Sequence, residues 1–194
     1  VDRLYRGMRR LAREFGVSIV GGDISRSDAI CVDISMLGQV EKKRLTLRSG
    51  GRPGDILFVT GRLGGSLGGR HLRFQPRVRE ARVLTARCRV HAMIDISDGL
   101  SSDLGHLCRA GKVGADIYQE LIPAYPGVTL EQALNDGEDF ELLFCVNRSD
   151  ARKLAGSGLP CFAVGRVTDA ANKVILVDRQ GRRVPLSAAG FRHF

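Results

Sequence analysis

The chain has 194 residues, of which 43% are hydrophobic, and a formal net charge of +9. This length allows one or two domains with a buried core, and no apolar run approaches the ~18 residues of a transmembrane helix, so we expect a soluble protein without membrane spans. The 30 Lys and Arg residues are scattered, without a basic block or a basic and aromatic alternation, which argues against nucleic acid and suits small anionic ligands.

The five cysteines are odd in number and include no CxxC pair, so their spacing predicts neither a disulfide framework nor a zinc site. Cys31 and Cys145 lie within apolar, strand-like runs, where we expect buried and unreactive thiols. This cysteine usage is typical of a protein from the reducing cytoplasm.

The first forty residues predict one helix and two strands. Apolar residues recur at helical spacing over 4–15, and Gly16 ends this helix. We expect a short strand at 17–20, followed by Gly21-Gly22-Asp23, whose glycines would let the backbone approach a ligand and direct Asp23 into open space. A purely structural turn is the alternative for so short a motif. Apolar alternation over 30–40 predicts a second strand.

A Gly, Pro and Arg-containing loop at residues 47–55 predicts a domain boundary. A compact strand follows at 56–60, and then an amide-rich segment at 61–69 that could wrap a phosphate, although it lacks the lysine pattern of a P-loop. Residues 77–89 have the pattern of a basic helix packed by apolar side chains.

The stretch Asp95-Ile96-Ser97-Asp98-Gly99 follows an apolar lead at 90–94 and precedes a helix start at Leu100. It places two carboxylates three residues apart, with a hydroxyl between them, at a strand-to-helix junction where backbone N–H groups are free. Carboxylates bind magnesium, and a hydroxyl with amides suits phosphate oxygens, so the turn could hold a metal-phosphate complex. The alternative is that Asp98 or Ser101 only caps the helix.

Four carboxylates then lie within the six residues 136–141, immediately before an apolar strand at 142–146. Such a cluster repels itself unless metals, cationic ligands or basic side chains compensate it, and a solvated turn is the alternative. Further elements are expected as strands at 114–118, 161–167 and 174–177 and as helices at 130–134 and 149–155. This alternation predicts an α/β or α+β fold, with helices layered on one face of a mixed sheet.

Taken in order, five motifs resemble the thiamine-monophosphate kinase family, in a superfamily that includes aminoimidazole ribonucleotide synthetase, selenophosphate synthetase and the hydrogenase maturation protein HypE. They are VGGDISRS (20–27), LRSGGRPGDILFVTGRLGGS (47–66), AMIDISDGLSSDL (92–104), GEDFELLF (137–144) and GFRHF (190–194). The resemblance implies a PurM-like C-terminal domain over residues 51–194 and the end of an ATP-binding N-terminal domain over residues 1–50. It aligns with only the later part of a family member, so we expect a fragment of a protein that is a homodimer when full length. The preceding segment in the family carries further magnesium-binding aspartates.

The same resemblance implies three groups of ligand contacts. Magnesium would be bound by aspartates: Asp23, Asp95 and Asp98. ATP would be contacted by Gly22, Arg48 and Ser97. Thiamine monophosphate would be held by Glu138 and Phe191, with Asp139 assisting. Among these residues, the catalytic role would fall to Asp95, Asp98 and Arg48.

The implied reaction transfers a phosphoryl group from ATP to the phosphate of thiamine monophosphate, and neutralising the charge of two anions is its main requirement. The acceptor oxygen is ionised at neutral pH, so no general base is needed, and His91 and His193 are expected to be structural. Two alternatives stay open: another ATP-using enzyme of the superfamily, and a noncatalytic nucleotide-binding module. Because the fragment lacks part of the first domain, we expect it to have little activity alone.

Overall fold

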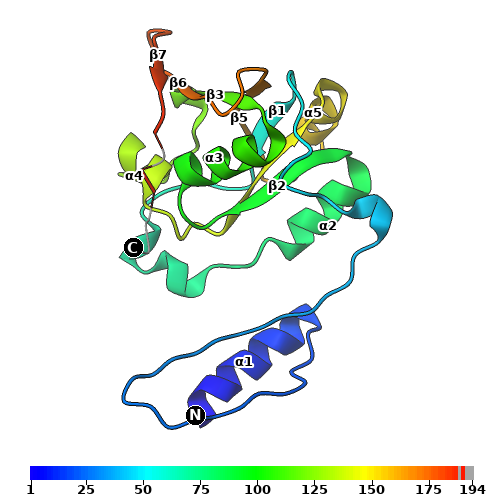
Figure 1. The fold of residues 1–194 in the computed structure, drawn as a ribbon, viewed down its shortest axis with the longest axis vertical. Coiled ribbons are helices and arrows are strands. Elements are labelled where there is room, and N and C mark those ends of the chain that lie inside the picture. Colours follow the sequence, from blue (N-terminus) through cyan, green and yellow to red (C-terminus); the bar gives the residue numbers. More distant parts are fainter. Residues whose placement is uncertain (188, 191–194) are drawn as a thin grey trace. The chain divides into compact units, whose positions relative to one another are not determined.

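A computed structural model describes residues 1–187 and 189–190 of the chain. Contacts between Cα atoms divide the chain into two compact units, Val1–Gln39 and Val40–Phe194, and each is described by itself (Figure 1). The first unit contains one helix, and the second contains a sheet with its covering helices.

The first unit consists of helix α1 (Asp2–Phe15) and a long loop. The helix ends where the sequence predicts, because Gly16 adopts the left-handed conformation with φ 66°. The N–H of Val17 then donates to the carbonyl of Ala12 over an N···O distance of 2.8 Å, which satisfies one of the last free carbonyls of the helix.

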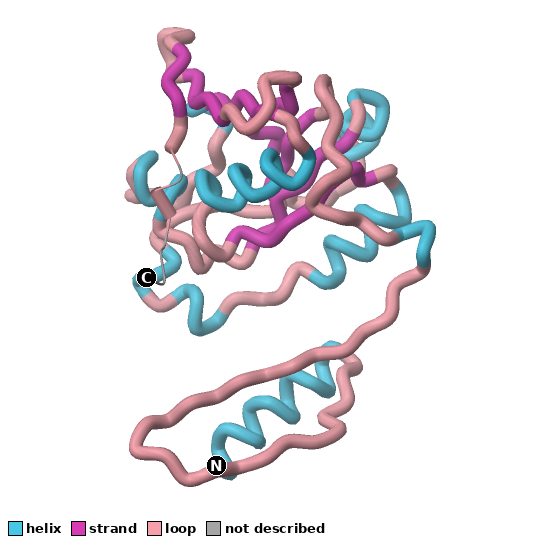
Figure 2. Tube along the Cα trace, viewed as in Figure 1, coloured by secondary structure: helices cyan, strands magenta, loops and turns pink. Residues whose placement is uncertain are grey.

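The two strands expected at 17–20 and 30–40 do not form, and both segments are loop (Figure 2). A strand is stable only when a neighbour satisfies its N–H and C=O groups and packs against its side chains, and no described segment pairs with either stretch. Their apolar side chains are therefore exposed, as at Val20 (96%) and Ile30 (98%). Cys31 is also exposed, contrary to the expected burial.

The second unit is built on one mixed sheet of seven strands, which confirms the mixed α/β class. The strand order is β2-β4-β1-β5-β3-β6-β7, and the pairs are antiparallel except for β3 with β6. In chain order the strands are β1 (Ile56–Val59), β2 (Val90–Ile96), β3 (Gly114–Tyr118), β4 (Glu141–Val146), β5 (Phe162–Thr168), β6 (Val174–Val177) and β7 (Arg183–Pro185).

Helices cover both faces of this sheet rather than the one face that the sequence predicted. They are α2 (Val78–Arg87), α3 (Leu100–Gly111), α4 (Leu130–Asn135) and α5 (Arg148–Ala155). Side chains alternate along β1, so Leu57 joins the core that includes α3 and α4, while Phe58 joins a second core. Leu84 of α2 and Leu154 of α5 bury the second face against Phe58 and Phe144, and each such side chain contributes roughly 1.5 to 3 kcal/mol.

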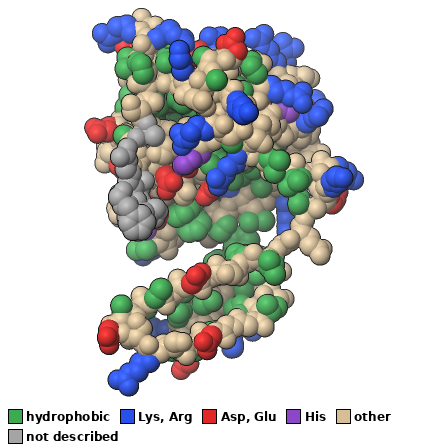
Figure 3. All heavy atoms as spheres, in the orientation of Figure 1, with side chains coloured by type: hydrophobic (Ala, Val, Ile, Leu, Met, Phe, Trp, Pro, Cys, Tyr) green, Lys and Arg blue, Asp and Glu red, His purple; other side chains and the backbone are tan. Residues whose placement is uncertain are grey.

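Lys and Arg side chains are dispersed over the face of the molecule that Figure 3 draws, in line with their scattered positions in the sequence. Among the described residues, no helix combines the length and apolar character that a membrane crossing requires. Cys145 is buried as expected, and burial raises the pKa of its thiol to about 12, so it stays protonated at neutral pH.

Candidate functional site

The carboxylate turn lies where strand β2 passes into helix α3. Residues alternate along β2, so Ile96 is fully buried while the neighbouring Asp95 is exposed. Gly99 makes the turn with φ 105°, and a Cβ there would lie 2.9 Å from the carbonyl oxygen of Leu134. The turn therefore needs glycine, and it presents Asp95 and Asp98 on either side of Ser97.

A buried aspartate that the sequence pattern did not single out holds this turn together. One oxygen of Asp103, Oδ2, accepts the N–H groups of both Ser97 (3.1 Å) and Asp98 (3.0 Å). The N-terminal capping position is occupied by Gly99 without a side-chain bond, so the alternative that Asp98 or Ser101 caps the helix is wrong. An acidic residue in the first turn of a helix is the sequence signal that could have identified Asp103.

The turn concentrates negative charge. Burial raises the pKa of Asp103 to about 7, and repulsion from Asp98 and Asp95 adds to the rise although two backbone N–H groups oppose it. Ligand atoms of Asp98, Asp103 and His106 all lie within 4.8 Å of one another. Within residues 1–187 and 189–190, the carboxylates of Asp95 and Asp98 form neither a hydrogen bond nor an ion pair. The group around Asp98 offers hard oxygen donors that fit a divalent cation such as magnesium, and Asp95 is not part of this group.

The acidic segment at 137–141 lies directly against this turn, although it is about forty residues away in the sequence. The N–H of Glu138 donates to the carbonyl of Ser97 (2.7 Å), and the N–H of Phe140 donates to that of Ile96 (2.8 Å). A Cβ on Gly137 would lie 2.6 Å from the Ser97 oxygen, so the close approach of the two backbones requires glycine. The structure thus brings together Ser97, Asp98 and Glu138, three of the residues that the sequence singled out.

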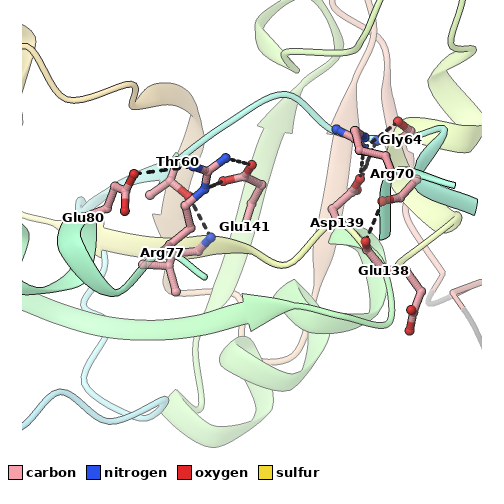
Figure 4. Close-up of polar contacts among 10 residues, drawn as sticks. Thr60, Gly64, Arg70, Arg77, Glu80, Glu138, Asp139 and Glu141 are labelled. Carbon is pink, nitrogen blue, oxygen red and sulfur yellow. Dashed lines mark hydrogen bonds and ion pairs between the residues drawn. The ribbon is translucent and has the colours of Figure 1, made fainter. Parts of the chain in front are cut away.

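Basic side chains compensate two of the clustered acids, as one of the sequence hypotheses required (Figure 4). Asp139 is paired with Arg70 over 2.7 Å, and Glu141 is paired with Arg77 over 2.6 Å. Both acidic side chains are almost fully buried, so the alternative of a solvated turn is wrong for them. Sequence reasoning did not find either arginine, because each lies more than sixty residues from its partner.

The amide-rich segment at 61–69 uses its donors inside the protein. The N–H of Gly64 lies 3.0 Å from both carboxylate oxygens of Asp139, and the N–H of Gly65 donates to Asp136 over 3.1 Å. These two amides are therefore occupied by carboxylates of the same chain and do not contribute to the phosphate wrapping that the sequence left possible for this segment. Burial raises the pKa of Asp139 to about 6, while the Gly64 N–H and Arg70 lower it.

Two other residues of the second unit that the sequence analysis named, Arg48 and His91, have different surroundings. Arg48 is exposed, and the preceding carbonyl of Leu47 accepts the N–H of Met93 in β2 (3.2 Å). His91 has the expected structural role, since its Nδ1 lies 2.8 Å from a carboxylate oxygen of Asp55 and both side chains are buried.

The C-terminal motif begins beside the carboxylate turn. The N–H of Gly190 donates to the hydroxyl of Ser102 (3.2 Å), and its Cα is so close to the carbonyl of Asp98 that no side chain would fit. Phe191 and His193, the other residues of this motif singled out above, lie outside the described residues.

Gly22 and Asp23 belong to the first unit. The carboxylate of Asp23 is exposed and accepts the N–H of its neighbour Ile24 over 2.8 Å. A Cβ on Gly22 would lie 3.3 Å from the hydroxyl of Tyr5.

The mixed sheet with its carboxylate turn defines a recognisable class of protein. The family model described as AIR synthase related protein, C-terminal domain, matches residues 52–178, which is more than half of the chain. The model described as AIR synthase related protein, N-terminal domain, matches residues 1–40. The chain belongs to the AIR synthase related family.

Within this family the chain groups with the thiamine-monophosphate kinases. It is 42% identical to that of Rhodopirellula baltica over 177 residues, covering 84% of this chain and 55% of the relative. It is 31% identical to that of Aquifex aeolicus over 224 residues, covering all of this chain and 69% of the relative. The solved structure named AaThiL complexed with AMPPCP and TMP is similar with 26% identity and a TM-score of 0.75. The match covers all of the present chain and 68% of the chain in that structure. The chain thus spans little more than half the length of the first relative.

Proposed function

We propose that this protein catalyses the magnesium-assisted transfer of a phosphoryl group from ATP to thiamine monophosphate, giving thiamine diphosphate and ADP. The observation that carries the proposal is the turn with Asp95 and Asp98, which contacts the backbone of Glu138 and whose two carboxylates have no hydrogen-bond or ion-pair partner among the described residues. Family membership agrees with it, as does a relative with 26% identity whose structure contains AMPPCP and TMP.

The nucleotide side of the proposed site uses oxygen ligands and one fixed positive charge. Asp95 and Asp98 would hold magnesium, and Asp23 of the first unit would supply another carboxylate. The bound metal would neutralise charge on the transferring phosphate. The Ser97 hydroxyl and the Gly22 backbone would contact the nucleotide.

The acceptor side of the proposed site must recognise a cation and tolerate a phosphate. The Glu138 carboxylate would compensate the positively charged thiazolium, and Phe191 would pack against its ring. Arg48 is exposed and free to approach the phosphates of ATP, where its positive charge would reduce repulsion between donor and acceptor. The acceptor phosphate is already ionised at neutral pH, so none of these residues needs to remove a proton.

The domain assignment is part of the same proposal. Residues 1–50 would complete an ATP-binding domain and residues 51–194 would form the C-terminal domain, in a protein that works as a homodimer. The match of residues 1–40 to the N-terminal family model supports the first assignment.

A product assay on the complete gene product tests the function. With magnesium, ATP and thiamine monophosphate, we expect equal amounts of thiamine diphosphate and ADP. An aminoimidazole ribonucleotide precursor in place of thiamine monophosphate should give no ADP above background. ADP formation that depends on that precursor would favour another enzyme of the superfamily, and ATP binding without any turnover would favour a noncatalytic module.

A further inference from the structure

One network that the proposed function does not use holds the backbone on which Glu138 lies. We call it the clamp, and it consists of Gly64, Ser66, Arg70 and Asp139. Figure 4 labels Gly64, Arg70 and Asp139. The Asp139 carboxylate accepts the N–H of Gly64 (3.0 Å) and an N–H of Arg70 (2.7 Å). The hydroxyl of Ser66 donates to the carbonyl of Glu138 over 2.6 Å. The clamp therefore forms hydrogen bonds to two successive residues of the acidic segment, Glu138 and Asp139.

The backbone that the clamp grips has an unusual conformation. Glu138 has φ 56° and Phe140 has φ 51°, which is the left-handed region that residues with a side chain seldom adopt. Such a conformation persists only where surrounding contacts enforce it. The carboxylate turn supplies contacts on one side, through the carbonyls of Ser97 and Ile96, and the clamp supplies them on the other.

The conformation separates two neighbouring acids. Asp139 is directed inward, where its side chain is 1% exposed, while Glu138 is half-buried. Figure 4 shows the Glu138 side chain directed away from the pair formed by Arg70 and Asp139. Gly64 and Arg70 are the partners that hold the Asp139 carboxylate in the interior. Without them, the network would not favour a buried Asp139 over a conformation in which both carboxylates face solvent.

Within the clamp, Arg70 makes contacts that a lysine side chain could not make. Its guanidinium lies over the ring of Tyr125, 3.7 Å from the centroid, and it also donates to the carbonyl of Gly64 (3.0 Å). It therefore joins an aromatic ring, a loop carbonyl and a buried carboxylate at once. A lysine would keep the charge but would lose the planar stacking and the several fixed donors.

We propose that Arg70 and Asp139 are positioning residues that set the affinity for thiamine monophosphate by holding Glu138 in its left-handed conformation beside the carboxylate turn. The inference rests on the proposed function, in which Glu138 contacts the thiamine moiety. Neither residue would touch the substrate itself.

The first test compares Arg70→Met, Arg70→Lys and Asp139→Asn with wild type in the complete gene product. We expect Arg70→Met to raise the calorimetric dissociation constant and the KM for thiamine monophosphate about tenfold, with the KM for ATP within about twofold of wild type. Arg70→Lys should recover part of this loss, and Asp139→Asn should resemble Arg70→Met. Equal shifts for ATP and thiamine monophosphate would show a merely structural role and overturn the inference.

The matched control is Arg183→Met, which breaks an ion pair with the buried Asp116 at the other end of the sheet. It should lower the melting temperature while leaving both KM values unchanged. A rise in the KM for thiamine monophosphate in this control as large as in Arg70→Met would contradict the inference, because any lost ion pair would then suffice.

A double-substitution cycle separates action through Glu138 from direct action. In a Glu138→Gln background, Arg70→Met should change the affinity for thiamine monophosphate by less than about twofold, because the residue it positions has already lost its charge. The full tenfold effect in that background would overturn the inference. If wild type does not phosphorylate thiamine monophosphate at all, the proposed function itself fails. Normal wild-type turnover with unchanged affinity in Arg70→Met defeats only the inference.

Discussion

Asp98 and Asp103 lie in the same turn but differ in what their carboxylates contact. Asp103 is buried and accepts two backbone N–H groups, so its role is to hold the turn. Asp98 is half-buried, and among the described residues its carboxylate has no hydrogen-bonding partner. A carboxylate without a partner is available to a cation, whereas one that is already bonded stabilises the backbone around it.

Phe191→Ala tests the acceptor side of the site. If Phe191 packs on the thiazolium ring, its loss should remove about 1 to 2 kcal/mol, which raises the KM for thiamine monophosphate about five- to thirtyfold. The KM for ATP should stay nearly constant. Steady-state kinetics in which each substrate is varied in turn measures both values.

A melting curve of the same variant provides the control. If Phe191 only fixes the C-terminus to the core, the variant should melt at a lower temperature and bind both substrates more weakly. Parallel increases in the two KM values would therefore remove the ring-packing role.

The sequence predicted the part of the candidate site whose residues lie close together within one motif. Asp95, Ser97 and Asp98 lie within four consecutive residues, so their common location followed from the strand-to-helix pattern. The partners of the buried acids could not be predicted in the same way. Arg70 and Arg77 are distant in sequence from Asp139 and Glu141 and contact them only through the tertiary fold, so no local sequence pattern indicates the pairing.

Three strands of the sheet are joined by one buried acid. Asp116 of β3 pairs with Arg183 of β7 (2.6 Å) and with Arg166 of β5 (3.1 Å). Asp116→Asn should lower the free energy of unfolding by about 1.5 to 3 kcal/mol at pH 7, the range for hydrogen bonds to a charged group. Urea denaturation followed by circular dichroism measures the difference.

The same substitution has a defined pH dependence. Burial raises the pKa of Asp116, but hydrogen bonds from Arg183 and Arg166 outweigh burial, so its pKa in the folded protein is below the usual value. The stabilisation is therefore fully present above the unfolded pKa of about 4, and it is lost as the pH falls through the folded pKa. The difference between wild type and Asp116→Asn should shrink below about pH 4. A difference that grows on acidification would contradict this assignment.

At the level of elements, the sequence predicted most of the second unit correctly, because its strands combine alternation with β-branched and aromatic residues. The exception is β7, which is three residues long and exposed throughout. The expected strands at 17–20 and 30–40 failed for a different reason. Their local pattern suits a strand, but strand formation depends on a partner that the described chain does not provide.

At the scale of the whole molecule, burial is concentrated in the second unit. Helix α1 contains no buried residue, whereas β1 and β4 are central strands with nearly continuous burial. Amides in α1 should therefore exchange with solvent at least about a thousandfold faster than those in β4, because local opening of α1 requires little free energy. Hydrogen exchange of residues 1–194 followed by mass spectrometry tests this, and comparable protection in both units would refute it.

The composition of the chain and its tertiary contacts change at different positions. The glycine-rich loop at 47–55 marks a change of composition, whereas the compact units meet between Gln39 and Val40. The hydrogen bond between Leu47 and Met93 shows that the chain already contacts β2 at the first residue of that loop. Composition indicates which segments lack regular secondary structure, whereas tertiary contacts determine the unit to which a segment belongs.

We propose that Asp95 and Asp98 hold the metal that makes transfer possible. Thiamine diphosphate formation by the complete gene product should be measured for wild type, Asp95→Asn and Asp98→Asn, with Asp169→Asn as an exposed control outside the site. We predict that each site variant loses at least about a hundredfold in rate while keeping the wild-type circular dichroism spectrum, and that the control keeps full activity. Near-normal transfer in both site variants would contradict the account.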